Sequence, residues 1–395
     1  MQSFNPMDPE FLADPYPTYH RLRAEDPVHQ SPLGFWVLTR YDDVSAVLRD
    51  PRFIKEPLAA LVAARFGAEV PRGVGLSMLD RDPPDHTRLR GLVSKAFTPR
   101  VVEGLRPRIQ QIVDELITRA QAAGSMDVIE EFAYPIPVNV ICEMLGVPLA
   151  DHERFKGWSL DIARGLDSIW LPPDSEVPRR SAASRHAIND YFRGLIAQRR
   201  ASPRGDLLSA LIAAEEAGDK LNEEELLATC ILLLIAGHET TVNLIGNGVL
   251  ALLRNPGELE RLRATPGLIT NAVEELLRYD GPVQRTARVA SAPATIGGRT
   301  IAKGEMVMPF IGAADRDPSQ FPDPDRLDLT RADNRHIAFG WGIHFCLGAP
   351  LARVEGQIAI DALVRRLPRL ELMTDAPEYR QSLTLRGLKT LPVKF

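Results

Sequence analysis

The chain has 395 residues, of which 45% are hydrophobic and 25% charged, so it is long and apolar enough to bury a substantial core. Its 47 basic and 52 acidic residues leave a net charge of −5, which gives no indication of a nucleic-acid or anionic-membrane partner. No repeat, low-complexity linker or charge block divides the sequence. We therefore expect a single domain over residues 1–395.

The amino terminus, MQSFNPMDPEFLADPYP, has prolines and acids where a signal peptide has a basic start and an apolar run. The longest strongly apolar run, CILLLIAG at residues 230–237, is far shorter than the roughly 20 residues that span a bilayer. We expect a cytoplasmic protein without a membrane partner. The three cysteines, Cys142, Cys230 and Cys346, are too few and too far apart for a disulfide framework.

The predicted elements are mostly helices. A short strand is expected at residues 34–40. Apolar residues recur every three or four positions over residues 103–124, which predicts an amphipathic helix that ends at Gly124. Prolines at residues 170–180 predict a long loop over a site. Residues 223–253 predict a core helix of ~45 Å, and Gly297-Gly298 within residues 294–313 predicts an antiparallel hairpin.

Three polar patterns stand on these elements. His86 and Arg90 in DPPDHTRLRG are four residues apart, so they share one face of a helix. AGHETT, residues 236–241, puts polar side chains in the middle of the core helix, where they either bend the helix locally or serve a reaction. Glu275 and Arg278 in EELLRYDGP are three residues apart, a spacing that alone is typical of a solvated surface pair.

The fourth pattern is HIAFGWGIHFCLG, residues 336–348. A zinc site would need further Cys or His ligands at short spacing, and a catalytic thiol would need a polar surrounding with a base, whereas phenylalanines flank Cys346. A thiolate bound to haem iron accounts for the neighbours, because glycines let the backbone approach a flat ring and backbone N–H groups bind the sulfur.

These four patterns, in this order, resemble those of the cytochrome P450 family, the haem-thiolate monooxygenases, in its soluble bacterial form. Residues 339–348 match the family's Phe-Gly-x-Gly-x-His-x-Cys-x-Gly ligand loop at every specified position. The resemblance implies a mainly α fold with small antiparallel β-sheets, shaped as a triangular prism, in which haem lies between the long central helix and the cysteine ligand loop.

The resemblance also implies the roles of individual residues. Cys346 would ligate the iron of haem b, iron protoporphyrin IX, and Glu239 with Thr240 would deliver protons to bound O2 next to a groove at Ala236 and Gly237. Glu275 and Arg278 would form a structural salt-bridge network with Arg316. The remaining haem-binding residues would be His86, Arg90, Arg288, Phe339, His344 and Gly348.

The residues of the family's pocket indicate a mainly apolar small-molecule substrate, and Met78, Leu233, Val283 and Gln284 are the expected lining. The chain carries neither a dinucleotide fingerprint nor an iron–sulfur cysteine set, so electrons would come from a ferredoxin or flavodoxin and an NAD(P)H-dependent reductase. Arg100, Arg335 and Arg353 are the expected docking contacts. Two alternatives remain open: an H2O2-driven peroxygenase, against which Glu239-Thr240 argues, and a non-enzymatic haem-based ligand sensor.

Overall fold

The computed structural model describes residues 5, 7–65, 76–171, 175–216 and 221–395. The chain divides into two compact units, each built from segments that are distant in the sequence. Unit 1 comprises Met1–Phe53, Glu103–Ile136 and Thr240–Phe395, and unit 2 comprises Ile54–Val102 and Pro137–Glu239. The single domain over residues 1–395 stays a prediction.

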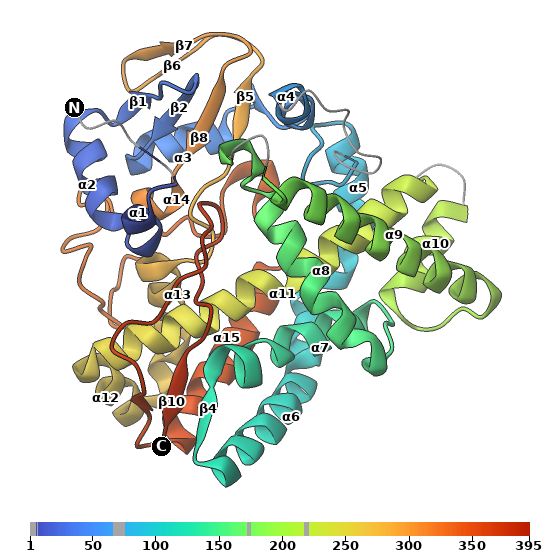
Figure 1. Ribbon diagram of the computed structural model, residues 1–395, viewed down its shortest axis with the longest axis vertical. Helices are drawn as coiled ribbons and strands as arrows, with labels where there is room; N and C mark the ends of the chain where they lie inside the picture. Colours follow the sequence, from blue (N-terminus) through green and yellow to red (C-terminus); the bar gives the residue numbers. More distant parts are fainter. Residues whose placement is uncertain (1–4, 6, 66–75, 172–174, 217–220) are drawn as a thin grey trace. The chain divides into compact units, whose positions relative to one another are not determined.

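Figure 1 labels most of the helices and strands along the chain. The elements of unit 1 are α1 (Pro9–Ala13), α2 (Tyr16–Glu25), β1 (Val28–Gln30), β2 (Phe35–Leu38), α3 (Tyr41–Arg49), β4 (Ser125–Asp127), η2 (Val128–Ala133), α12 (Pro256–Ala264), η5 (Pro266–Leu268), α13 (Ile269–Asp280), β5 (Arg288–Ala290), β6 (Ala294–Ile296), β7 (Arg299–Ile301), β8 (Met306–Pro309), α14 (Ile311–Ala314), η6 (Gly342–His344), α15 (Ala349–Arg366), β9 (Glu371–Leu372) and β10 (Pro392–Lys394).

The elements of unit 2 are α4 (Pro57–Arg65), α5 (Asp85–Ser94), η1 (Lys95–Phe97), η3 (Leu149–Asp151), α8 (His152–Gly165), η4 (Ser168–Trp170), α9 (Val177–Ala201) and α10 (Leu207–Glu216). Four further elements contribute residues to both units: β3 (Phe53–Ile54), α6 (Pro99–Ala123), α7 (Pro135–Met144) and α11 (Glu223–Arg254).

The sheets are small, as the sequence predicts. One has the strand order β1-β2-β8-β5-β3, a second has the order β4-β10-β9, and β6 pairs with β7 alone. The β6–β7 turn is the predicted hairpin, because Gly297 and Gly298 have φ angles of 51° and 80°, which glycine adopts without strain. One pairing differs from the antiparallel expectation: β8 leaves the hairpin and runs parallel to β2, with Phe35 opposite Met306.

The second half of α11 packs in the core of unit 1 against α13 and α15. Small residues permit the close approach. A Cβ on Gly248 would lie 3.1 Å from Leu276 Cδ1 and 3.3 Å from Ile360 Cδ1, and one on Gly356 would lie 3.1 Å from Leu244 Cδ2. The helix predicted for residues 223–253 is confirmed. It is long and apolar enough to cross a membrane, but 72% of its most apolar window is buried, which is typical of a core helix.

Unit 2 is a helical layer in which α8 packs along α9. Ser184 of α9 donates to Asp161 of α8 at 3.0 Å, and a Cβ on Gly165 would lie 2.2 Å from Ser181 Oγ. In the same unit, Arg88 of α5 holds the start of α11 through two bonds to Glu225, at 2.6 and 3.0 Å. The predicted loop at residues 170–180 is shorter than expected, since α9 begins at residue 177, and residues 172–174 lie outside the described residues.

Candidate functional site

The loop that carries Cys346 is held by its own backbone. Cys346 N donates to the carbonyl of Phe339 at 2.9 Å, which closes the loop. Gly340 and Gly342 have φ angles of 72° and 71°, in the left-handed region that side chains disfavour. A Cβ on Gly342 would also lie 2.4 Å from the carbonyl oxygen of Leu48. The glycines of the motif are therefore required by the path of the backbone in unit 1.

Cys346 differs from the other two cysteines. Cys142 and Cys230 are fully buried, and burial raises the pKa of each thiol to about 12, so both stay protonated and inert. Cys346 is half-buried and lies just before α15, which begins at Ala349. The partial positive charge at the amino end of a helix stabilises a thiolate at this place.

These features fit a thiolate ligand of haem iron. Cys346 is half-buried, and a Cβ on Gly348 would lie 3.9 Å from its sulfur, an ordinary contact. The ring centroids of Phe339 and Phe345, which flank the cysteine in the motif, lie 6.3 Å apart. These features do not fit zinc, since no cluster of three His, Cys, Asp or Glu side chains that could hold a metal ion occurs in the described part of the chain.

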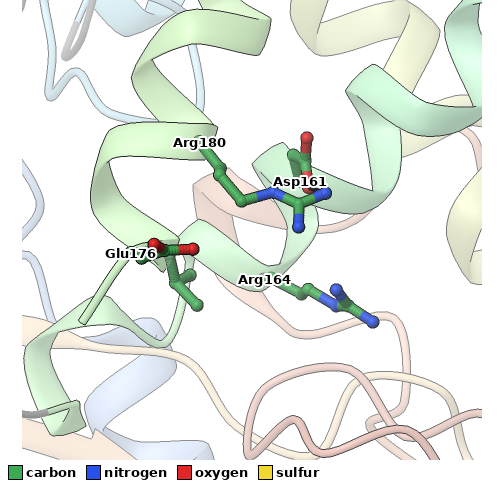
Figure 2. Close-up of a pocket in the computed structure, with 5 residues that line it drawn as sticks. Asp161, Arg164, Glu176 and Arg180 are labelled. Atoms are coloured by element: carbon green, nitrogen blue, oxygen red, sulfur yellow. Dashed lines mark ion pairs between the residues drawn. The ribbon is translucent and has the colours of Figure 1, made fainter.

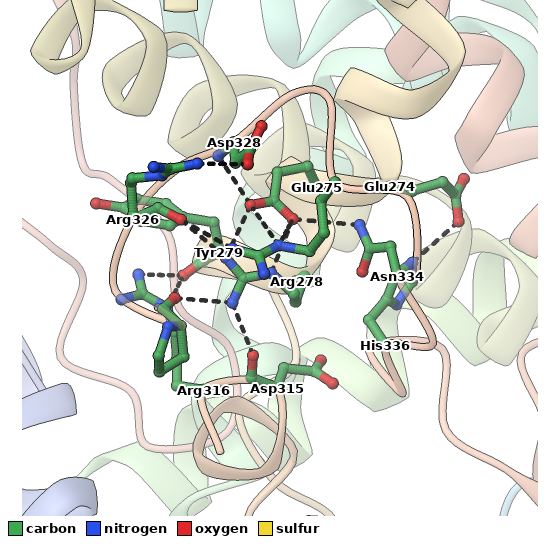
Figure 3. Close-up of polar contacts among 12 residues, drawn as sticks. Glu274, Glu275, Arg278, Tyr279, Asp315, Arg316, Arg326, Asp328, Asn334 and His336 are labelled. Atoms are coloured by element: carbon green, nitrogen blue, oxygen red, sulfur yellow. Dashed lines mark hydrogen bonds and ion pairs between the residues drawn. The ribbon is translucent and has the colours of Figure 1, made fainter. Parts of the chain in front are cut away.

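Glu275 and Arg278 of α13 form the centre of a buried polar network (Figure 3). Arg278 Nε and Nη2 each donate to a carboxylate oxygen of Glu275 at 2.8 Å, and both side chains have no exposed surface. Arg278 Nη1 also donates to the carbonyls of Asp315 and Pro324, at 2.9 and 2.8 Å. The pair thus holds the segment that leads to the ligand loop, and the alternative of a solvated surface pair is wrong.

The predicted third member of the network is wrong. Arg316 does not bond to Glu275 but donates to the carbonyl of Tyr279 and to Asp325, and its guanidinium lies 4.1 Å from the ring centroid of Tyr16. The second arginine on Glu275 is Arg331, whose Nε lies 3.2 Å from each carboxylate oxygen.

Sequence reasoning missed Arg331. Arg331 lies in TRADNRH, fifteen residues before Cys346, and contacts Glu275 of α13. Its position shortly before the ligand loop is the signal that could have indicated this role. Asn334 from the same stretch also donates to Glu275, at 3.2 Å.

A second set of charges anchors the ligand loop from the side of α13. Glu274 accepts from His336 at 2.9 Å and from Arg353 at 2.6 and 2.8 Å, and although burial raises the pKa of Glu274, these partners outweigh it and lower the pKa to about 2. Nearby, burial raises the pKa of Asp315 to about 7 while its carboxylate accepts from Ile337 N at 2.7 Å. Arg353, expected as a docking contact, is therefore already committed to Glu274.

Glu239 and Thr240 are neighbours on α11, so the helix itself fixes their relation. Glu239 is buried, with His238 Nε2 at 3.6 Å from its carboxylate, and His238 Nδ1 lies 2.6 Å from the carbonyl of Leu234. Ala236 is exposed and Thr240 half-buried one turn later, although the residues around them on this core helix are mostly buried. One narrow stripe of α11 thus remains accessible, and it carries the predicted hydroxyl.

α11 runs as one helix through Ala236 and Gly237, and the groove expected there stays a prediction. Gly237 has a packing role in unit 2: a Cβ there would lie 2.9 Å from Ile141 Cγ1 of α7.

Behind the threonines of α11 lies Glu355 of α15, which the sequence did not single out. Glu355 is 1% exposed, and among the residues that the structure describes neither carboxylate oxygen has a hydrogen-bond partner within bonding distance. Burial raises the pKa of Glu355 to about 8, although the nearby Thr241 hydroxyl lowers it in part. This carboxyl group is neutral at pH 7.

The predicted propionate-binding residues are divided between the units. In unit 1, Arg288 of β5 is buried and donates to Thr286 Oγ1 at 3.0 Å, and His344 lies in the ligand loop. In unit 2, His86 and Arg90 lie on one face of α5, His86 buried and Arg90 half-buried. Their joint action on haem stays a prediction.

The predicted pocket residues differ in what they contact. Met78 and Leu233 of unit 2 are buried apolar side chains, and Val283 of unit 1 forms a β-bridge with Leu385. Gln284 does not present a free amide, because it accepts from Tyr19 Oη at 3.0 Å and donates to the carbonyl of Gly281 at 2.8 Å. The prediction that Gln284 lines the pocket is therefore not supported, since its amide has a structural role.

A small cavity of about 140 Å³ lies between the end of α8 and the start of α9 (Figure 2). Its wall is charged: Arg180 pairs with Asp161 at 3.0 Å, and Arg164 and Glu176 complete it with Val177. This cavity does not have the apolar lining expected of the substrate pocket.

Comparison with known proteins shows a family and individual relatives that this chain is similar to. The family model described as Cytochrome P450 matches residues 28–265 and 267–394. The chain is 46% identical to the Vitamin D(3) 25-hydroxylase of Pseudonocardia autotrophica, over 97% of this chain and 94% of that protein. It is 44% identical to the cytochrome P450 monooxygenase PikC of Streptomyces venezuelae, over 98% and 92%.

Among solved structures, the chain is similar to a myxobacterial cytochrome P450, CYP267B1, in complex with myristic acid. The TM-score is 0.92 and the sequence identity 44%, over 98% of each chain. This similarity extends over both compact units.

Proposed function

The chain belongs to the cytochrome P450 family and is an oxidoreductase of that class, and we propose that it inserts one atom of O2 into a mainly apolar small organic molecule, by hydroxylation or epoxidation. The observation that carries this proposal is the geometry of Cys346. This half-buried residue stands on a loop that glycines and a buried arginine network hold in place, at the positive end of α15.

The proposed cofactor is haem b. When bound through a thiolate, haem supplies the iron at which O2 is activated and its O–O bond is cleaved. Cys346 is the proposed ligand, with Phe339 and Gly348 beside it. The proposed partners of the propionates are His86, Arg90, Arg288 and His344, because charge-assisted bonds to carboxylates suit these side chains.

Glu239 and Thr240 are proposed to move protons to the bound oxygen. A buried carboxylate next to a hydroxyl on the same helix can take a proton that comes from solvent and pass it to the hydroxyl. The accessible stripe at Ala236 and Thr240 gives a small molecule room beside that hydroxyl. The buried Glu355 is neutral at pH 7 and therefore adds no negative charge behind this helix.

The substrate is proposed to be mainly apolar, since Met78 and Leu233 are apolar and the named ligands of the relatives, vitamin D3 and myristic acid, are large apolar molecules. Electrons are proposed to come from a ferredoxin or flavodoxin with an NAD(P)H-dependent reductase. Trp341 and Ile343 support docking at the ligand loop, because they are 37% and 51% exposed and Arg49 lies 4.5 Å over the Trp341 ring.

The test is the absorption spectrum of the purified, dithionite-reduced protein under carbon monoxide. A thiolate ligand shifts the Soret band strongly to the red relative to a His-ligated haem, and Cys346→His should abolish this shift while Cys142→Ser leaves it unchanged. Absence of haem, or the band of a His-ligated haem in the wild type, would refute the proposal. Product formed with O2, reductase and NAD(P)H distinguishes a monooxygenase from an H2O2-driven peroxygenase or a ligand sensor.

A further inference from the structure

Two short segments of unit 1, residues 282–284 and 384–386, lie side by side. Val283, a predicted lining residue, pairs with Leu385 in an antiparallel β-bridge. Two backbone hydrogen bonds between the segments, at 2.9 and 2.7 Å, flank this bridge. The backbone therefore fixes where each of these paired segments lies against the other.

The two faces of the paired segments differ. Side chains alternate between faces along an extended chain, so Val283 and Leu385 share one face, which we call the apolar face. Gln284 and Arg386 share the opposite face. Val283 and Leu385 are half-buried, whereas Gln284 and Arg386 are only 2% and 6% exposed. The apolar face is thus accessible, and the opposite face is packed inside unit 1.

Arg386 fastens the packed face to the amino-terminal helix α1. Its Nη1 donates to the carbonyls of Ala13 and Leu12, at 2.9 and 3.3 Å. Its Nε donates to Asp280 Oδ1 at 2.6 Å, and its guanidinium lies 3.7 Å from the ring centroid of Tyr379. A planar guanidinium that meets a carboxylate, two carbonyls and a ring is held in one orientation.

Two tyrosines of α2 reach the same packed face. Tyr16 Oη donates to Asp280 Oδ1 at 2.7 Å, so it holds the carboxylate that in turn holds Arg386. Tyr19 Oη donates to Gln284 Oε1 at 3.0 Å. Both rings are buried, and their centroids lie 5.9 Å apart in an edge-to-face arrangement. α2 is therefore bonded to both paired segments, directly to one and through Asp280 to the other.

From these contacts we propose that the amino-terminal segment, residues 12–19, positions the substrate. Arg386 and Gln284 transmit its hold to the paired segments, and the substrate meets their apolar face at Val283 and Leu385. A small displacement of such a face changes how a bound molecule is oriented, which is enough to alter its affinity and reaction. This inference rests on the proposed monooxygenase function, and the segment takes no part in the oxidation itself.

The test compares two azole ligands on the haem-loaded protein at pH 7.5. Imidazole and econazole bind haem iron through the same kind of ring nitrogen, but only econazole is large enough to contact the walls around it. Tyr16→Phe keeps the ring and removes the hydroxyl, so it should weaken econazole about three- to tenfold, the range of one hydrogen bond, and leave imidazole unchanged. Arg386→Lys should weaken econazole at least as much, because it also loses the bonds to α1.

Tyr191→Phe is the matched control. It removes a bond of the same kind in unit 2, from Tyr191 Oη to Asp151 at 2.8 Å, and both azoles should bind as in wild type. Hydrogen exchange supplies a readout without a ligand. The backbone amides of residues 382–388 should exchange faster in Tyr16→Phe and at the wild-type rate in Tyr191→Phe.

A double-mutant cycle tests whether the segment acts through the apolar face. Val283→Ala removes the contact that Tyr16 would position, so in this background Tyr16→Phe should weaken econazole by no more than about twofold. An undiminished effect of Tyr16→Phe in Val283→Ala protein would show that the two side chains act independently and would overturn the inference.

Two further results would overturn it. One is wild-type econazole affinity in haem-loaded Tyr16→Phe protein, a variant that serves even if Arg386→Lys fails to bind haem. The other is an equal weakening of imidazole and econazole, which indicates a general loss of structure. Neither result alters the carbon monoxide spectrum of the wild type, so failure of the positioning role is distinguishable from failure of the proposed function.

Discussion

Replacement of Arg278 by alanine should prevent the chain from incorporating haem. The substitution removes both hydrogen bonds to Glu275, whose carboxylate has no exposed surface, and leaves two carbonyl groups, those of Asp315 and Pro324, without their donor. Breaking a buried ion pair by removing one partner costs about 3 to 5 kcal/mol. Because whole proteins are stable by only about 5 to 15 kcal/mol, this loss is a large fraction of the total.

Alanine substitution should cost more stability at Arg278 than at Arg331. Arg331 contacts the same carboxylate at 3.2 Å, but Arg331→Ala leaves the bidentate pair of Glu275 and Arg278 intact. Arg326→Ala is the control, since Arg326 is 67% exposed and solvent screens its pair with Asp328, so the substitution should change stability little. Arg278→Lys retains the positive charge but lacks the planar guanidinium that binds both carboxylate oxygens, so its loss of stability should lie between those of Arg331→Ala and Arg278→Ala.

The assay is haem content per polypeptide after purification, together with the midpoint of thermal unfolding. We expect the order Arg326→Ala, Arg331→Ala, Arg278→Lys, Arg278→Ala, from near wild type to apoprotein. Arg278→Ala protein with a normal haem content and an unchanged unfolding midpoint would show that this network does not hold the ligand loop.

Three further predictions concern α11 and two carboxyl groups. Thr240→Ala should keep haem and ligand binding but lower product formed per NAD(P)H by roughly tenfold or more, with H2O2 in its place; unchanged coupling would remove the proton-delivery role. Glu355 retains its proton up to about pH 8 in the folded chain but ionises near pH 4.5 when unfolded, so stability is lost as pH rises between these values, by about 3 kcal/mol at pH 7. Glu355→Gln should therefore raise the unfolding midpoint at pH 7.5 more than at pH 5, and an equal change at both would contradict the buried neutral state. The pKa of Glu274 is depressed to about 2, so its contribution is present above pH 4.5 and lost as pH falls towards 2; Glu274→Gln should flatten the acid limb of a stability–pH curve, and an unaltered limb would show that His336 and Arg353 do not stabilise it.

The sequence was most informative where a local pattern has a single conformational reason. The glycines at 340 and 342 predicted a tight loop because the left-handed backbone favours glycine, and both angles are found there. The long apolar period predicted α11 to within a residue of its observed end. These features depend on neighbours in the chain, which a sequence displays directly.

The sequence was least informative where distant segments meet. Arg316 was assigned to Glu275 in place of Arg331, because the path of residues 315–335 decides which arginine reaches the carboxylate. Gln284 was taken as pocket lining although Tyr19, 265 residues away, binds its amide. Glu355 gave no signal, since a glutamate at helical spacing is indistinguishable from an exposed one until the packing of its helix is known.

The last residues of the chain complete unit 1. Strand β10 pairs with β4, with Val393 opposite Met126, and Phe395 N donates to the carbonyl of Gly124 at 3.2 Å. During synthesis, some 270 further residues must therefore be made after β4 before its partner strand β10 exists. Pairing of β4 therefore cannot precede synthesis of β10, so deletion of residues 392–394 should remove the strand on which β4 pairs and leave more of this unit unfolded and open to proteases.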